Sequence, residues 1–80
     1  MTTLKRAINE MPSVVRQELA DRGLLDAYDA RPAYQRNDYL GWISRAKRPE
    51  TRQKRLRQML AELEQGDVYM NMHWAPGRDG

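Results

Sequence analysis

The dipeptide Arg48-Pro49 separates two helix-forming stretches, and this break constrains the fold more than any other feature of the chain. Proline lacks an amide hydrogen and disfavours helix at the residue before it. It is tolerated in the first turn of a helix, where an amide hydrogen would have no intrahelical partner. We therefore predict one helix over about residues 33–47 and a second that begins at Pro49 and ends near residue 65, before Gly66.

Both predicted helices carry an apolar stripe with residues spaced three and four apart. We expect the two helices to pack together through these stripes, by way of Trp42, Ile43, Ala46, Leu56, Met59, Leu60 and Leu63. The chain has no Phe, so Trp42 and Tyr39 are the large aromatic residues predicted for this core. The alternative is that Trp42 stacks on nucleic-acid bases, and this requires its ring to lie exposed beside the basic residues.

Upstream of this pair, Pro12 interrupts a run of apolar residues at helical spacing. The interruption predicts a short helix near residues 3–10 and a longer helix that has Pro12 in its first turn. Gly23 is suited to the left-handed residue that ends this helix, with Leu24 in contact with Leu19. Residues 25–33 form a connection with room for one helical turn.

The C-terminal segment has a different pattern. From Val68 to Trp74, apolar and polar residues alternate with a period of two, which is typical of an extended chain. No partner strand is evident, so we expect either a segment laid across the helices or a loose end, with residues 76–80 disordered.

Together these patterns predict an all-α fold with a three-helix core, a short extra N-terminal helix and an extended C-terminal tail. The chain of 80 residues is long enough for one domain, which we place at residues 1–67, with an extended or partly disordered tail at 68–80.

Positive charge is concentrated in one segment. Residues 45–57 hold seven of the fourteen basic side chains and one acid, Glu50, so the segment has a charge of +6 in a chain of net charge +3. A partner that recognises the protein by charge is expected to contact this segment. The candidate residues for binding an anion or a partner are Arg45, Lys47, Arg48, Arg52 and Arg55. Lys54 and Arg57 are expected to be solvated surface charges.

Arg52 differs from the other basic residues because it lies about 30° from the centre of the apolar stripe on an ideal helical wheel. We therefore expect Arg52 to be partly buried, with hydrogen-bond partners for its guanidinium group. A salt bridge to Asp38 or Glu50, or a bond to a carbonyl at a helix end, would provide a structural role. The functional alternative is an anion-binding fork formed with Arg45, Arg48 and Arg55.

The sequence shows no recognisable arrangement of metal-ligating or catalytic residues. The chain has no Cys, and His73 stands without acids at ligand spacing, so we expect no metal site, no cofactor and no catalytic residues. Three acids lie near the end of the last helix, namely Glu62, Glu64 and Asp67. We interpret them as solvent-exposed charges that favour solubility, or alternatively as an acidic edge that faces a partner. With no export signal and no membrane-spanning run, a cytoplasmic monomer is expected.

Part of the chain resembles a known family. The residues that carry the resemblance are Tyr39, Trp42, Ile43, Ala46, Lys47, Pro49, Glu50, Thr51, Arg52 and Arg55. Their pattern resembles that of the YdeI/OmpD-associated family, also called the bacteriocin-protection family. The similarity covers about residues 33–66, and Met11-Pro12 with Leu19 resembles the segment found upstream.

The resemblance implies a small all-α module, linked by name to protection against bacteriocins or antimicrobial peptides and to a porin. We therefore expect a non-enzymatic interaction module with an unknown protein partner and a role in bacterial stress or antimicrobial-peptide protection. The alternative is binding of a nucleic acid or other polyanion through residues 45–57. Polyanion binding weakens steeply with salt, which distinguishes the two hypotheses.

Overall fold

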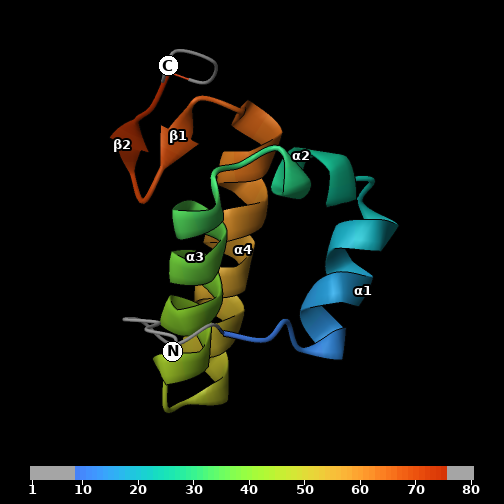
Figure 1. Ribbon diagram of the computed structural model, residues 1–80. Helices are drawn as coiled ribbons and strands as arrows, with labels where there is room; N and C mark the ends of the chain where they lie inside the picture. The colour runs from blue at the N-terminus through green and yellow to red at the C-terminus, as the bar shows by residue number, and fades with distance from the viewer. Residues whose placement is uncertain (1–8, 76–80) are drawn as a thin grey trace, which may run out of the picture.

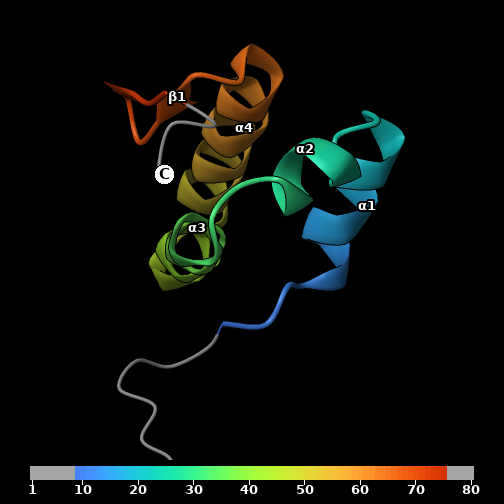
Figure 2. The same ribbon diagram turned by 45° about the horizontal axis from the view of Figure 1, so that its top comes forward.

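A computed structural model describes residues 9–75 of the chain, and Figure 1 shows how its elements are arranged. The elements are α1 (Ser13–Asp21), α2 (Leu25–Asp29), α3 (Ala33–Arg45), α4 (Pro49–Gln65), β1 (Val68–Tyr69) and β2 (Met72–His73). Helices α3 and α4 lie side by side as an antiparallel pair, with α1 and α2 to one side of them (Figures 1 and 2). The strands lie at the end of the pair where α4 finishes. The predicted all-α class is confirmed.

The interface between α3 and α4 contains most of the residues predicted for it. Six of the seven predicted packing residues are buried, namely Ile43, Ala46, Leu56, Met59, Leu60 and Leu63. Trp42 differs from the prediction because it is only partly buried and packs at the edge of the core. The core is completed by Val15 and Leu19 of α1, with Leu24 and Tyr28 from the α2 region.

Helix α1 ends as the sequence predicts. Gly23 has a φ of +70°, in the left-handed region that glycine adopts without steric cost. Its N–H donates to the carbonyl of Ala20 at 3.1 Å, and the N–H of Leu24 donates to the carbonyl of Leu19 at 2.8 Å. These two bonds form a Schellman motif. At the other end of α1, Pro12 is the N-cap residue. It therefore lies one position before the first turn, in which the sequence predicts it.

The helix predicted near residues 3–10 falls mostly outside the described residues, and the two that are described, Asn9 and Glu10, are not helical. Asn9 instead binds α3. Its backbone N–H donates to Asn37 Oδ1 at 2.7 Å, and its side-chain amide donates to the carbonyl of Asn37 at 3.1 Å. A Cβ at Gly41 would lie 2.8 Å from Asn9 Nδ2, so the glycine permits this close crossing.

The C-terminal segment forms a hairpin, and the prediction that it has no partner strand is wrong. β1 pairs with β2 in antiparallel register, with Val68 opposite His73 and Tyr69 opposite Met72. The two turn residues, Met70 and Asn71, have φ values of 50° and 66°. Two positive φ values are what a two-residue hairpin turn requires, but this turn is usually built with Asn-Gly or Asp-Gly. The sequence therefore carried no strong turn signal.

The carboxylate of Glu62 holds this unusual turn. Its Oε1 accepts the N–H of Met70 at 2.8 Å, and its Oε2 accepts the N–H of Asn71 at 2.9 Å. The hydroxyl of Tyr39 on α3 also donates to Oε1, and the amide of Gln58 donates to Oε2 at 3.0 Å. Glu62 is 4% exposed, so the prediction of a solvated acid at this position is wrong. One side chain joins α4, α3 and the hairpin.

Two opposing effects act on the pKa of Glu62. Burial would raise the pKa, but the hydrogen bonds from Tyr39, Asn71, Met70 and Gln58 outweigh it, so the pKa lies below its ordinary value. Burial and the bond to Glu62 raise the pKa of Tyr39 above its usual range. At neutral pH, Tyr39 therefore stays a donor and Glu62 stays a charged acceptor.

The hairpin is further attached through Tyr69 and Trp74. The hydroxyl of Tyr69 donates to Asp38 Oδ2 at 2.7 Å, and its ring meets that of Tyr39 edge to face, with 5.4 Å between centroids. The guanidinium of buried Arg31 lies 4.6 Å from the centroid of Trp74. Arg31 Nη2 also donates to the backbone carbonyl of Glu62 at 3.0 Å. These contacts pack residues 68–74 onto the helices.

The Glu62 network generates a prediction about stability. Glu62→Gln puts an amide N–H₂ group where both oxygens accept hydrogen bonds, so it should lower the free energy of unfolding by about 2–3 kcal/mol in urea titrations at neutral pH. The matched control is Glu64→Gln on the exposed side of the same helix, which should change it by less than about 0.5 kcal/mol. Equal effects would contradict the network.

The same pair predicts a pH dependence. Because the folded-state pKa of Glu62 is lowered, its stabilisation is fully present above the ordinary value of 4.5 and is lost as the pH falls through the folded-state pKa. The gap in unfolding free energy between wild type and Glu62→Gln should therefore shrink in acid. A gap that stays constant down to about pH 3 would show that the carboxylate charge is not what the site uses.

Candidate partner-binding site

The basic segment of residues 45–57 lies at the α3–α4 turn, at the end of the helix pair away from the hairpin (Figure 1). Arg45 ends α3, Lys47 and Arg48 form the turn, and all three side chains are exposed. Among residues 9–75 they have neither a hydrogen bond nor an ion pair. Lys54 and Arg57 are also exposed, as predicted. The structure thus gathers three exposed cations at one turn.

Arg52 is exposed, which corrects the prediction that it is partly buried. Its Nη1 donates to the carbonyl of Ala46 at 2.9 Å, so a helix-end carbonyl is the acceptor, as one predicted alternative has it. Ala46 directly follows α3, so no N–H group of that helix donates to its carbonyl. Arg52 lines a groove together with Ile43 and Ser44 of α3, and this position leaves its side chain exposed.

Arg55 has a structural role as well. Its Nη1 donates to the carbonyl of Trp42 at 2.6 Å, and its guanidinium lies 5.2 Å from the centroid of the Trp42 ring. The guanidinium therefore covers part of a ring that the sequence places in the core. Two of the five candidate cations, Arg52 and Arg55, thus use one donor each to fix the end of α3.

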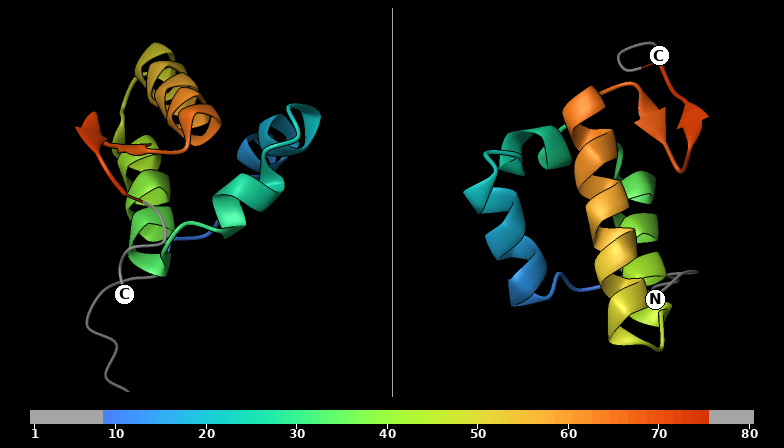
Figure 3. Two further views of the ribbon diagram at one scale, coloured as in Figure 1. Left: turned by 90° about the horizontal axis from the view of Figure 1, so that it is seen from above. Right: turned by 180° about the vertical axis from the view of Figure 1, so that it is seen from behind.

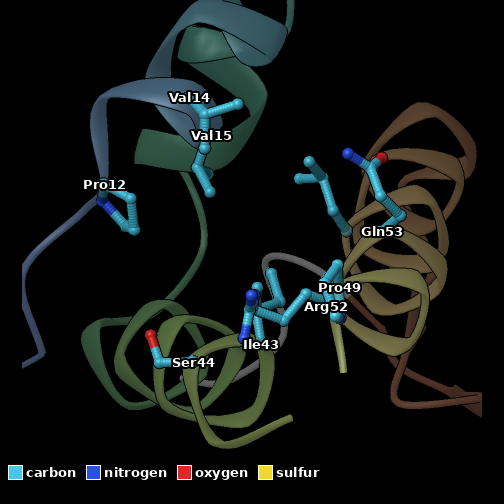
Figure 4. Close-up of a pocket in the computed structure, with 9 residues that line it drawn as sticks. Pro12, Val14, Val15, Ile43, Ser44, Pro49, Arg52 and Gln53 are labelled. Carbon is cyan, nitrogen blue, oxygen red and sulfur yellow. The ribbon is translucent and has the colours of Figure 1, made fainter. Parts of the chain in front are cut away.

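A groove lies beside the basic segment, between α1 and the α3–α4 pair (Figure 4). Its volume is about 300 Å³, and it is lined by Pro12, Val14, Val15, Ile43, Ser44, Pro49, Arg52, Gln53 and Leu56. The groove exists because α1 packs on α2, which in turn packs on α4, so the start of α1 stands away from α4 (Figure 3). Val14 is 57% exposed although it is aliphatic.

The remaining family-motif residues build this end of the molecule. Pro49 is the first residue of α4 and lines the groove, Glu50 lies in the first turn, where its charge complements the helix dipole, and Thr51 is partly buried. Tyr39 and Ile43 are buried on α3. The motif therefore specifies the turn, the seam between the helices and one wall of the groove.

Sequence reasoning missed the α1 wall of the groove. Val14 lies next to Val15 at the start of a helix, and the helical period predicts that only one of two adjacent residues is buried. That signal would have marked Val14 as an exposed aliphatic residue, but it does not reveal that α3 and α4 lie across from it. Of the predicted acidic end, Glu64 and Asp67 are exposed and Glu62 is not.

The sequence model of one protein family, described as "Bacteriocin-protection, YdeI or OmpD-Associated", matches residues 9–66. The match covers well over half of the chain. The protein belongs to this family. The resemblance carried by the motif around Trp42 and Pro49 is thereby confirmed, and the match extends upstream through α1 to Asn9.

Comparison with curated proteins and with solved structures found no match for this chain. Within residues 9–75, no helix is both long enough and apolar enough to cross a bilayer, and no group of three or more His, Cys, Asp or Glu is arranged to hold a metal ion.

The arginine contacts at the end of α3 predict a graded series. Arg55→Ala should lower the free energy of unfolding by about 1–2 kcal/mol, because it removes a bond to a carbonyl and a cation–π contact. Arg52→Ala should cost less, since Arg52 is exposed, and Lys54→Ala should change it by less than about 0.5 kcal/mol. Urea titration of the three variants measures the order, and equal losses at Arg55 and Lys54 would contradict it.

Proposed function

We propose that the protein is a non-enzymatic interaction module that binds a segment of a partner protein in the groove between α1 and the α3–α4 pair. The observation that carries this proposal is the groove itself, with its aliphatic lining and the half-exposed Val14 at its edge. Aliphatic surface of this kind is favourably removed from water by a partner.

The geometry suits a helical or extended peptide better than a small molecule. A volume of about 300 Å³ is at the lower end for small-molecule pockets, and the groove is partly open to solvent. Grooves between helices commonly accept the apolar side chains of an amphipathic segment, spaced three and four residues apart. The polar lining side chains, Ser44, Arg52 and Gln53, lie on α3 and α4. They would orient a bound segment.

The family name supports a protective role of this interaction. Antimicrobial peptides are mostly cationic, and residues 45–57 carry a charge of +6, so this segment would repel them. We therefore propose that protection works through a cellular protein partner and not through direct capture of such a peptide by the basic segment.

The proposal predicts that Val14 matters for binding and not for folding. A neutral amphipathic peptide with Leu at helical spacing should shift the amide NMR signals of Val15, Ile43 and Leu56, and Val14→Glu should weaken its affinity by about tenfold or more. Met72→Glu is the matched control, because Met72 is 59% exposed and lies on the hairpin away from the groove. It should leave the affinity unchanged.

Thermal unfolding of both variants should stay within a few degrees of wild type, since neither side chain is buried. Equal loss of affinity in Val14→Glu and Met72→Glu, or signal shifts confined to the hairpin, would contradict binding in the groove.

A second candidate function is polyanion binding, favoured by the three exposed cations Arg45, Lys47 and Arg48 at the α3–α4 turn. The contacts would be to backbone phosphates, without reading of base sequence. Three contacts to single-stranded DNA predict a slope of roughly −2 for log affinity against log salt concentration. Replacing all three by Gln should flatten this slope in fluorescence anisotropy with an oligothymidylate. No binding at low salt would eliminate this candidate.

A further inference from the structure

We propose that the partner segment is an acidic amphipathic helix, and that Arg52 receives one of its carboxylates at the rim of the groove. The inference rests on the proposed function, because it names the class of partner for the same groove. Two observations support it. The groove has an aliphatic lining, and the guanidinium of Arg52 is held in place beside it.

Arg52 is already oriented in the free protein. One donor of its guanidinium, Nη1, is bound to the carbonyl of Ala46, while the side chain remains exposed and lines the groove. A guanidinium carries five N–H donors in a planar fork, so donors remain for a carboxylate. Because the side chain is held by the helix end, less rotational freedom is lost on binding than for a free surface arginine.

The surrounding charge also selects an acidic partner. Lys47 and Arg48 lie in the turn before α4, and both are exposed. The single acid of residues 45–57 is Glu50. A carboxylate near the groove therefore experiences a positive field, which speeds its encounter and disfavours cationic segments. On the opposite wall, the α1 side chains that line the groove are the uncharged Pro12, Val14 and Val15. The acidic edge of the partner should thus face α4.

A second copy of this chain fits the groove less well than such a helix. A two-fold contact through this face would place two segments of charge +6 against each other, and like charges across an interface cost stability. The occupant that complements both the apolar lining and the charge is a helix with an apolar stripe bordered by Glu or Asp.

The test uses two synthetic peptides of roughly 16 residues, long enough to form helix. Both have Leu at the same helical spacing, and the positions beside the stripe are Glu in one and Lys in the other. Binding to the full chain is measured by isothermal titration and by amide NMR shifts at about 0.15 M salt, where distant charges are screened.

The proposal expects the Glu peptide to bind in the groove at least about tenfold more tightly than the Lys peptide. Arg52→Glu should reverse this preference. The matched control, Lys54→Glu, makes the same change of charge on the same helix at an exposed residue outside the groove lining, and it should leave the order of the two peptides unchanged. The peptide pair on the wild-type chain stands as a test even if Arg52→Glu fails to fold.

Other outcomes overturn the proposal in distinguishable ways. If both peptides bind equally and Val14→Glu weakens both, the acidic preference is wrong and the groove function stands. If Lys54→Glu acts as strongly as Arg52→Glu, the attraction is diffuse and Arg52 has no special role. If neither peptide shifts groove signals, or Val14→Glu has no effect on binding, the proposed function fails too. Self-association in sedimentation experiments that Val14→Glu abolishes would make a second copy the occupant.

Discussion

The buried carboxylate of Glu62 determines how the two ends of the α3–α4 pair differ. At the end where α4 finishes, this carboxylate accepts hydrogen bonds from Tyr39 of α3 and from both N–H groups of the hairpin turn. It therefore connects α4, α3 and the hairpin. A non-glycine residue with positive φ, such as Met70, costs free energy that these charge-assisted bonds offset. Among residues 9–75, no buried carboxylate joins the elements at the opposite end, where the basic turn and the groove are exposed to solvent.

Much of the helical framework could be predicted from local sequence signals. Proline at the start of α4, glycine in the left-handed position after α1 and the apolar period of three and four each act within one or two helical turns. The hairpin could not be predicted, because its turn residues Met70 and Asn71 depend on a carboxylate that reaches them from α4. Glu62 lies three residues after Met59, at the edge of the apolar stripe, and only the position of Tyr39 shows why an acid is buried there.

The candidate site was predictable in part. The concentration of positive charge at residues 45–57 is visible in the sequence, and so is the need of Arg52 for an acceptor. Two things required the structure. The exposure of Arg52 follows from the groove that it lines, and the groove follows from how α2 holds α1 away from α4. Both depend on how the helices are placed relative to one another, which no local pattern of residues specifies.

Binding in the groove requires α1 to stand across from α3 and α4 in solution. The chain has no Cys, so Val14→Cys gives a single site for a nitroxide spin label. Paramagnetic broadening of amide NMR signals should then be strong at Ser44 and Gln53, which line the same groove, and absent at His73 on the hairpin. Broadening confined to α1 itself, or spread evenly along the chain, would contradict a groove between these helices.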